Sequence, residues 1–283
     1  MNAAGRSEAV LITGCSSGIG KAAAERLAKK GHTVYATARR LDSIRDLEAA
    51  GCKLLELDVT DEQSMATAVK AVEDAEGAVG VLVNNAGYSQ SGAVESVPMD
   101  AVRRQFETNV FGLVRMTQLV LPGMRRQGWG RIVNISSMGG RLVFPGGGYY
   151  HGTKFAVEAI SDALRYEVKG FGVGVTIIEP GLIKTEFGST AAGSLAPTGD
   201  DGPYAVFNTA VGTTTAGAYE SGGLSRLGAG PEAVAKAIER AIKKPKPRML
   251  VTPSARILLG LRRLMTDSMW DRSMRTNFPQ PGA

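Results

Sequence analysis

Cysteine, histidine and aromatic residues are scarce in this sequence of 283 residues. It has two cysteines and two histidines, and aromatic side chains make up 6% of the chain. Two cysteines cannot form a disulfide framework or a zinc ligand set, so we expect free thiols and no catalytic metal. No apolar run approaches the ~20 residues that span a bilayer, and no stretch typical of a signal peptide precedes the first expected strand. The composition therefore predicts a cytoplasmic protein with one large domain.

Acidic residues are scarce near the C-terminus. Residues 240–283 hold ten Lys and Arg against two Asp, and apolar residues at helical spacing lie within 254–283. We expect this basic amphipathic tail to pack on the domain or on a neighbouring subunit, with contact to a membrane surface as the alternative. Because interleaved aromatics and DNA-reading motifs are lacking, no nucleic-acid partner is expected.

Apolar runs alternate with helical patterns along most of the chain. Strands are expected at 9–13, 33–38, 53–58, 79–87, 130–137, 173–181 and 247–252. Helical patterns occupy 18–31, 41–51, 65–77, 99–127 and 150–169, and Thr60 with Gln63 is expected to form a capping box before the third of them. Strands this uniformly apolar are buried on both faces. The pattern predicts a doubly wound, Rossmann-like α/β domain over residues 1–253, with a parallel seven-stranded sheet and helices on both faces.

Residues 188–230 interrupt this alternation. They are crowded with Gly, Ser, Thr and Ala and contain only a short helical pattern, near 203–211. A segment this long inside a compact domain is more often a lid or binding loop than a tolerated insertion. We expect residues 188–224 to be mobile without substrate and to close over it.

The sequence TGCSSGIG follows the first expected strand and enters a helix. Gly14 permits a tight turn, Gly18 allows close approach of a phosphate, and Gly20 allows the helix to pack on the sheet. Ser16 and Ser17 can donate hydroxyl hydrogen bonds, and the unpaired N–H groups at the helix start favour an anion. The spacing differs from the common G-x-G-x-x-G, so this motif alone leaves an ordinary tight turn as the alternative.

Tyr150 and Lys154 are spaced i and i+4 in YHGTK, which places them on one face of a helix. A phenol with a pKa of about 10 is a poor acid at neutral pH, but a neighbouring ammonium lowers that pKa. Ser137 ends an expected strand, at the sheet edge where doubly wound folds bind ligands, and its hydroxyl can hold a carbonyl oxygen. Together these residues predict a site for proton transfer.

With these motifs the sequence resembles the short-chain dehydrogenase/reductases, in their single-domain branch with Tyr-x-x-x-Lys. The resemblance covers about residues 7–253 and rests on TGCSSGIG, DVT, NNAG, FETNVFG, ISS, YHGTK and PGLIKT. It implies that Tyr150 is the general acid–base and that Lys154 lowers its pKa and binds the nicotinamide ribose. It also implies that Ser137 positions the reacting oxygen and that Asn109 completes a proton relay through water.

The resemblance further implies which residues contact the cofactor. The glycine-rich turn contributes Gly14, Ser16, Ser17, Gly18, Ile19 and Gly20, and the adenosine side contributes Asp58, Val59, Asn84, Asn85, Ala86 and Gly87. The segment near the carboxamide contributes Pro180, Gly181, Ile183 and Thr185. A homodimer or homotetramer, paired through the helices near 99–127 and 150–169, is also implied.

Ala38 ends the second expected strand, where an acid would bind the ribose hydroxyls of NAD. Arg39 follows with a guanidinium that can bind a 2′-phosphate, and Arg40 is next to it. This combination favours NADP(H) over NAD(H), unless both arginines are simply solvated turn residues.

We therefore expect an NADP(H)-dependent oxidoreductase that transfers a hydride between nicotinamide and a carbonyl or secondary alcohol of an apolar small molecule. The alternative is a regulatory protein that senses NADP(H) without turnover, although such a protein does not need the catalytic residues. The apolar pocket candidates are Tyr88, Met138, Leu142, Val143, Phe144, Tyr149 and Phe187. His32 and His151 are expected to be neither bases nor ligands, and Asn134 and Ser136 to support the site.

Overall fold

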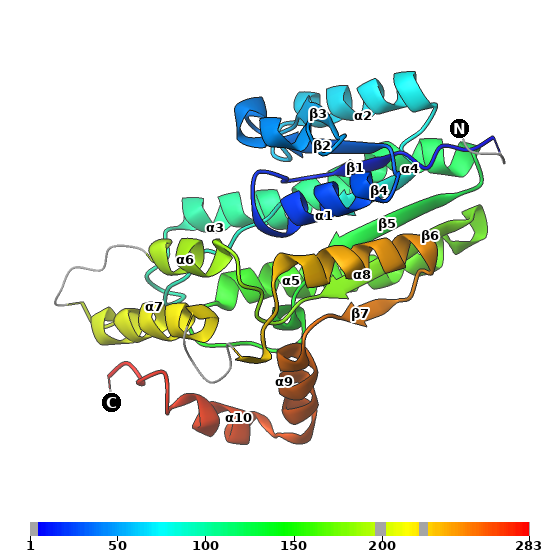
Figure 1. Cartoon of the computed structure of the whole chain (residues 1–283). Helices are drawn as coiled ribbons and strands as arrows, with labels where there is room; N and C mark the ends of the chain where they lie inside the picture. Colours follow the sequence, from blue (N-terminus) through cyan, green and yellow to red (C-terminus); the bar gives the residue numbers. More distant parts are fainter. Residues whose placement is uncertain (1–4, 196–201, 221–225, 283) are drawn as a thin grey trace.

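The computed structural model describes residues 5–195, 202–220 and 226–282. Within these residues, seven strands form one sheet of order β3-β2-β1-β4-β5-β6-β7, and all neighbours are parallel (Figure 1). The strands are β1 Val10–Ile12, β2 Val34–Ala38, β3 Lys53–Glu56, β4 Val81–Asn84, β5 Gly130–Ile135, β6 Val173–Glu179 and β7 Arg248–Leu250. The predicted doubly wound, Rossmann-like fold is confirmed.

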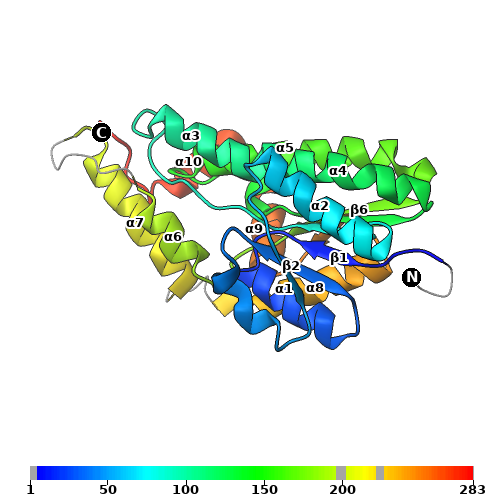
Figure 2. The same cartoon turned by 90° about the horizontal axis from the view of Figure 1, so that it is seen from above.

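Helices cover both faces of the sheet, with α1 and α8 on one face and α2 and α4 on the other (Figure 2). The described helices are α1 Gly18–Lys29, α2 Glu62–Glu76, α3 Met99–Phe106, α4 Gly112–Arg126, α5 Gly148–Glu167, α6 Phe187–Gly193, α7 Ala205–Glu220, α8 Pro231–Lys243, α9 Pro253–Leu264 and α10 Asp267–Met274. Val10 and Ile12 pack into the core with α1 and α8, whereas Leu11 packs into the opposite core with α2 and α4. This alternation is why the strand sequence is apolar at every position.

Three local predictions are corrected by the structure. Residues 41–51 form a 3₁₀ helix over Leu41–Leu47 and a turn, not an α-helix. The capping box of Thr60 and Gln63 is wrong, because Asp61 caps α2 by accepting from the N–H of Ser64. The helix expected over 99–127 is interrupted by a π-helical turn at Glu107–Phe111, between α3 and α4.

The segment 188–230 contains more helix than its sequence predicted. It holds most of α6 and the sixteen-residue α7, which lie side by side (Figure 1). The run 205–220 is free of proline but holds four threonines and two glycines, so its composition does not favour a helix, and the packing of α7 on α6 supports it instead. Residues 196–201 and 221–225, on which part of the predicted mobility falls, lie outside the described residues.

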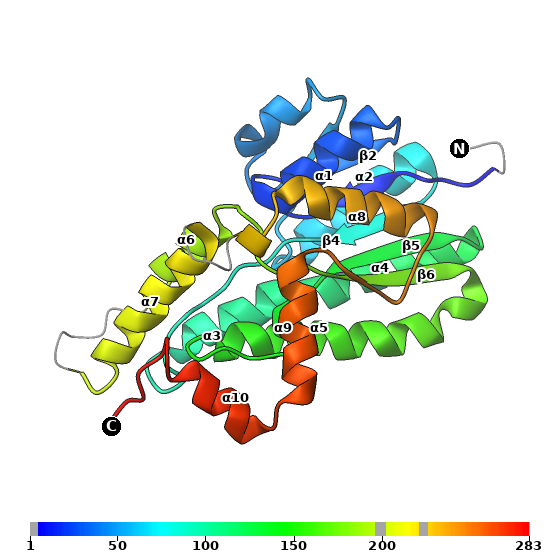
Figure 3. The same ribbon diagram turned by 60° about the horizontal axis from the view of Figure 1, so that its bottom comes forward.

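The C-terminal tail packs on the domain through α9 and α10 (Figure 3). Ala255, Leu259 and Trp270 share an apolar cluster with Met138 and Leu142, which follow β5. The indole N–H of Trp270 donates to the carbonyl oxygen of Val143 at 3.0 Å. Along the described ranges, every helix is too short or too polar to cross a bilayer.

Candidate active site

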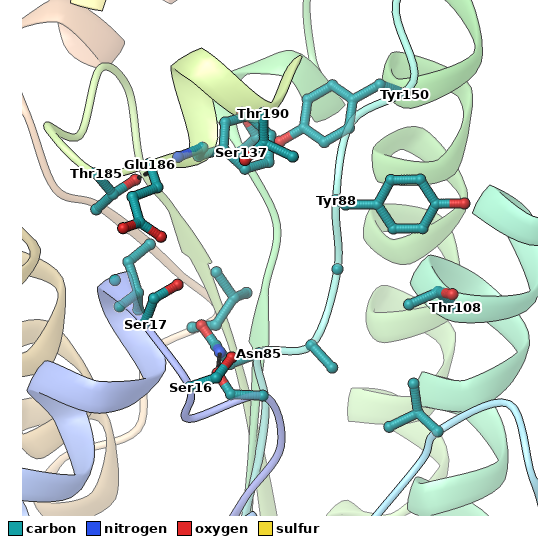
Figure 4. A pocket seen from close by; sticks show the side chains of 18 of the residues that line it. Ser16, Ser17, Asn85, Tyr88, Thr108, Ser137, Tyr150, Thr185, Glu186 and Thr190 are labelled. Carbon is teal, nitrogen blue, oxygen red and sulfur yellow. Dashed lines mark hydrogen bonds between the residues drawn. The ribbon is translucent and has the colours of Figure 1, made fainter. Parts of the chain in front are cut away.

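A cavity of about 880 Å³ opens at the carboxyl edge of the sheet (Figure 4). Its lining comes mainly from the ends of β1 to β6 and the loops that follow them, and also from α1, α3, the π-helical turn, the start of α5 and α6. Ser137 and Tyr150 lie together in one part of this cavity, and Ser16 and Ser17 lie in another (Figure 4). This is the edge at which doubly wound folds bind ligands.

The glycine-rich turn has the backbone geometry that its sequence implied. Gly14 has φ +73°, and a Cβ there would lie 2.9 Å from the Cα of Ala86. A Cβ at Gly20 would collide with the carbonyl oxygen of Gly14, so Gly20 lies behind the cavity, where α1 meets the turn. Ser17 stands at the N-cap of α1 without a side-chain cap, which leaves the first N–H groups for an anion. The turn therefore fits a pyrophosphate.

The neighbouring residues Asn85 and Asn84 lie on different sides of the cavity wall. The Asn85 amide donates to the carbonyl oxygens of Thr13 and Gly14, both at 2.9 Å, and Asn85 lines the cavity with Ala86 and Gly87. The Asn84 amide is buried and donates to Thr117 and Asn134 instead. The structure therefore places Asn84 behind the cavity, as a link between β4, β5 and α4.

The end of β2 lies at the wall of the cavity where the sequence predicts discrimination between NAD(H) and NADP(H). Ala38 and the exposed Arg39 line the cavity, with Asp58 and Val59 close by on the same wall. Arg40 is not part of the lining and precedes the 3₁₀ helix that begins at Leu41. Of the two arginines, the structure therefore brings only Arg39 to the cavity.

Tyr150 on the first turn of α5 meets Ser137, the second residue after β5. Burial raises the pKa of Tyr150 to about 12, and a hydrogen bond with Ser137 opposes this rise. The Ser137 oxygen also accepts from the N–H of Gly139 at 3.0 Å, so its own proton remains available for donation. At neutral pH this arrangement presents a protonated phenol beside a hydroxyl donor.

Lys154 lies one turn further along α5, and its ammonium donates to the carbonyl oxygen of Ile135 at 2.8 Å. Burial lowers the pKa of Lys154 to about 8, while the charge of Glu158 opposes this shift. The ammonium is 5.8 Å from the centre of the Tyr150 ring. In this structure, burial and the hydrogen bond with Ser137 are the two causes that shift the pKa of Tyr150. A lowering of this pKa by Lys154 remains a prediction.

Asn109 is buried in the π-helical turn and does not line the cavity. Its amide donates to the carbonyl oxygen of Tyr88 at 2.8 Å and to the hydroxyl of Thr153 at 3.1 Å. Its side-chain oxygen accepts from the N–H of Tyr88 at 3.1 Å. Asn109 therefore joins the loop after β4 to α5, and its place in a proton relay remains a prediction.

Two of the seven apolar pocket candidates line the cavity, namely Tyr88 and Phe187. The Phe187 ring lies 5.4 Å from that of Tyr150. Tyr149 packs against Val97, Ala101 and Val102, while the remaining candidates, Met138, Leu142, Val143 and Phe144, face the C-terminal tail or solvent. For these five residues the predicted pocket position is wrong, because Tyr149 packs on α3 and its neighbours, and the tail packs on the loop after β5 that carries the other four.

The sequence did not point to several lining residues on α3, the π-helical turn and α6. They are Arg104, Glu107, Thr108, Glu186 and Thr190. These residues reach the cavity only because α3 and α6 pack near the carboxyl edge of the sheet. The only sequence signal is that Glu186 and Thr190 closely follow PGLIKT.

His151 is buried, and its two nitrogens bind backbone groups of one loop. Nε2 accepts from the N–H of Phe144 at 3.2 Å, so Nδ1 carries the proton and donates to the carbonyl oxygen of Gly139 at 2.9 Å. The ring thus anchors the loop whose Gly139 N–H contacts Ser137. Within the described ranges, no group of three His, Cys, Asp or Glu could hold a metal.

A Rossmann-like sheet with a pyrophosphate cradle and a Ser, Tyr and Lys site defines a nicotinamide-dependent oxidoreductase. Residues 8–193 match the family model described as short chain dehydrogenase, and the chain belongs to the short-chain dehydrogenase/reductase family, whose members use NAD(P).

Three similar proteins illustrate the family. The NADPH-dependent 3-dehydrocapnine reductase of Ornithobacterium rhinotracheale is 37% identical over 93% of this chain and 94% of its own. The 3-ketodihydrosphingosine reductase of Bacteroides thetaiotaomicron is 42% identical over 63% of this chain and 65% of its own. The crystal structure of a short-chain dehydrogenase from Streptomyces avermitilis is 35% identical, covers 95% of this chain and 98% of that one, and has a TM-score of 0.78.

Proposed function

We propose that this protein reduces a ketone group of an apolar small molecule to a secondary alcohol with NADPH. The observation that carries the proposal is the meeting of Ser137 and Tyr150 in the cavity that also contains the pyrophosphate cradle. The two relatives are both named as reductases, which supports the reductive direction. A sensor of NADP(H) without turnover does not need a buried phenol held by a serine.

The chain's own residues carry out the binding and the proton transfer. When bound, the reduced nicotinamide supplies the hydride that the carbonyl carbon receives. The Ser137 hydroxyl donates to the carbonyl oxygen and holds it beside Tyr150. Tyr150 then gives its proton to that oxygen, so the product is a neutral alcohol and the phenol is reprotonated from solvent. Lys154 uses one N–H on Ile135, and its charge stabilises the tyrosinate that forms.

We propose NADP(H) rather than NAD(H) as the preferred cofactor. Ala38 offers no carboxylate to the ribose hydroxyls, and Arg39 brings an exposed guanidinium to the same wall of the cavity. A carboxylate there would repel a 2′-phosphate, whereas a guanidinium binds it with two N–H groups. The relative named as NADPH-dependent supports this preference.

We propose an apolar substrate with an extended chain. Tyr88 and Phe187 line the cavity beside Tyr150, and they contribute rings rather than charges. The names of the two relatives, which include 3-keto and 3-dehydro compounds, support a ketone group on the substrate.

A panel of ketones, aldehydes and quinones tests this function through the oxidation of NADPH. We expect turnover of long-chain ketones at kcat/KM values at least about tenfold above those of short polar ketones, since each buried methylene adds ~0.8 kcal/mol. The absence of turnover with every ketone would contradict the proposed reaction. Equal turnover of short polar ketones would contradict only the proposed substrate class.

We propose that α6 and α7 act as a lid that closes over the substrate. They contact the body mainly through the loop after β4, where the N–H of Ala93 donates to the side chain of Asn208 at 3.0 Å and that of Ser91 to Ser194 at 2.9 Å. Hydrogen exchange should show faster exchange in α7 than in β5, and slower exchange in α7 once NADPH and substrate are added. Strong protection of α7 in the free enzyme would contradict a mobile lid.

We propose a homodimer or homotetramer formed through the long helices. Phe111, at the C-terminal end of the π-helical turn, and Tyr166 on α5 are 55% and 86% exposed, and a second chain packed on these helices would cover both rings. Light scattering should give a mass of two or four chains. A monomer at micromolar concentration would contradict this proposal.

We propose a cytoplasmic location. Cys15 and Cys52 are both free and buried, as expected where thiols remain reduced. Fractionation of cells should recover the protein with the cytoplasmic proteins, and recovery with the membranes would contradict the location.

A further inference from the structure

A second cavity, of about 710 Å³, lies between the domain and the C-terminal tail. Its walls come from the loop 141–145, from α5, α7, α9 and α10, and from the residues after α10. None of its described lining residues lines the catalytic cavity. It is therefore a separate space, and the proposed reaction makes no use of it.

Much of the second cavity is lined by large apolar side chains. They are Leu142, Val143, Phe155, Phe207, Leu259, Trp270, Met274 and Phe278. Phe155 and Val143 are 44% and 42% exposed. Exposing such side chains to water is unfavourable, so the cavity would gain from an apolar occupant.

The same cavity carries a surplus of positive charge. Four arginines line it, together with Asp267 and Asp271. Arg141 pairs with Glu179, and Arg262 pairs with Asp267. Arg263, Arg275 and Asp271 have no ion pair among the described residues, so the unpaired groups of the lining still carry a net positive charge. Two cations beside an apolar wall match a ligand with an anionic head and an apolar chain.

We propose that this cavity binds an amphiphile with a carboxylate or phosphate head and an apolar chain. Arg263 and Arg275 bind the head, and the ring of Trp270 with its apolar neighbours covers the chain. Thr214 on α7 donates to the carbonyl oxygen of Asn277 at 3.2 Å, so the lid helix and the tail already meet next to the cavity.

The cavity also adjoins the catalytic loop through a row of aromatic rings. Trp270 lies 5.8 Å from Phe144, which lies 6.0 Å from His151. His151 in turn lies 5.6 Å from Tyr150. A ligand against Trp270 therefore lies at one end of this row of rings, and Tyr150, the proton donor, lies at the other. The ligand does not contact the reacting atoms.

Calorimetric titration of the full-length protein with decanoate tests the proposal. We expect saturable binding of one decanoate per chain, and binding of decyl phosphate at similar affinity. Decanol, which lacks the charge, and inorganic phosphate, which lacks the chain, should each bind at least about tenfold more weakly. Decanoate affinity should fall as salt is raised, whereas decanol affinity should not.

Arginine variants assign the head group to this cavity. The double variant Arg263→Gln, Arg275→Gln should lose at least about tenfold in decanoate affinity. The matched double variant Arg256→Gln, Arg272→Gln removes the same charge from α9 and α10 outside the cavity lining, and should bind as the unmodified protein does. Equal losses in the two double variants would overturn the proposal, because general electrostatics would then explain the binding.

The fluorescence of Trp270 reports where the chain binds. In a Trp129→Phe background Trp270 is the sole tryptophan. Decanoate should shift its emission, and this shift should saturate over the same decanoate concentrations as the heat of binding. The variant Phe187→Ala, in the catalytic cavity, should leave this curve unchanged. No saturable binding up to millimolar decanoate, or binding that Phe187→Ala removes, would overturn the proposal.

Discussion

The cofactor side and the substrate side of this molecule are built in different ways. On the cofactor side, Gly14 and Gly20 let backbone approach backbone, and Asn85 ties the ends of β1 and β4 together. On the substrate side, α6 and α7 are brought to the loop after β4, and the tail is brought to the loop after β5, from distant parts of the chain. The first side depends on short motifs and the second on long-range packing, so substitutions should affect them differently.

The largest effect is expected at the boundary between the two sides, at Tyr150. Tyr150→Phe keeps the ring but removes the proton donor, so kcat should fall by about 10²- to 10⁴-fold. NADPH affinity, measured by fluorescence titration, should change little, because the cradle lies around Gly14 and Gly18. A kcat close to that of the unmodified enzyme would contradict the assignment of Tyr150.

Loss of the His151 anchor should destabilise the loop that joins both sides. His151→Leu leaves the carbonyl oxygen of Gly139 and the N–H of Phe144 without their partners, at a cost of about 1–3 kcal/mol each. Urea unfolding should show this loss, while His32→Leu at a partly exposed position should change stability by less than about 0.5 kcal/mol. Equal stability of the two variants would show that the anchor is unimportant.

A pair of glycine variants compares the two sides directly. Gly20→Ala places a methyl group against the carbonyl oxygen of Gly14 and should cost about 1–3 kcal/mol, together with much of the NADPH affinity. Gly217→Ala, in α7, meets nothing within 4 Å and should stabilise the protein by up to about 1 kcal/mol. Thermal unfolding checks both variants. Similar destabilisation by both would remove the contrast between the sides.

Lys154 should impose a pH dependence on stability. Its pKa falls from 10.5 to about 8 on burial, so the unfolded chain binds more protons between these values and folding becomes more favourable as pH rises. The free energy of unfolding should therefore rise from pH 8 to pH 10 in the unmodified protein, relative to Lys154→Met. The raised pKa of Tyr150 acts only above pH 10 and does not mask this trend. A falling difference would contradict the burial of a charged Lys154.

The sequence alone was sufficient to predict the sheet, the glycine-rich turn and the contact between Ser137 and Tyr150. For the sheet and the turn the signal is local, because it lies within a run of apolar residues or a short motif. For Ser137 and Tyr150 it is the position of Ser137 after a strand, together with the family resemblance. The sequence was insufficient to predict the direction of two side chains. The amide of Asn84 donates to Thr117 and Asn134, and Tyr149 packs on α3. Such directions depend on neighbours far along the chain, and so does the burial that sets the pKa of Tyr150.

The long segment after β6 shows the same limit. Its glycine and serine content predicted a loop, yet α6 and α7 form there and are held by Asn208 and Ser194 against the loop after β4. The tail covers Met138 and Leu142, which the sequence had assigned to the substrate pocket. Tertiary packing overrides local composition at both places.

The central claim is that this enzyme transfers hydride from NADPH, selected by Ala38 and Arg39, to a ketone held at Tyr150. A charge-assisted contact with the 2′-phosphate contributes about 1.5–3 kcal/mol, which corresponds to a preference on the order of tenfold to a hundredfold. The most direct measurement is therefore kcat/KM for NADPH and for NADH with one long-chain ketone, in the unmodified enzyme and in the variant Ala38→Asp, Arg39→Leu. We predict that NADPH is preferred by the unmodified enzyme by that factor and that the variant prefers NADH. An unmodified enzyme that uses NADH as well as or better than NADPH would contradict the claim.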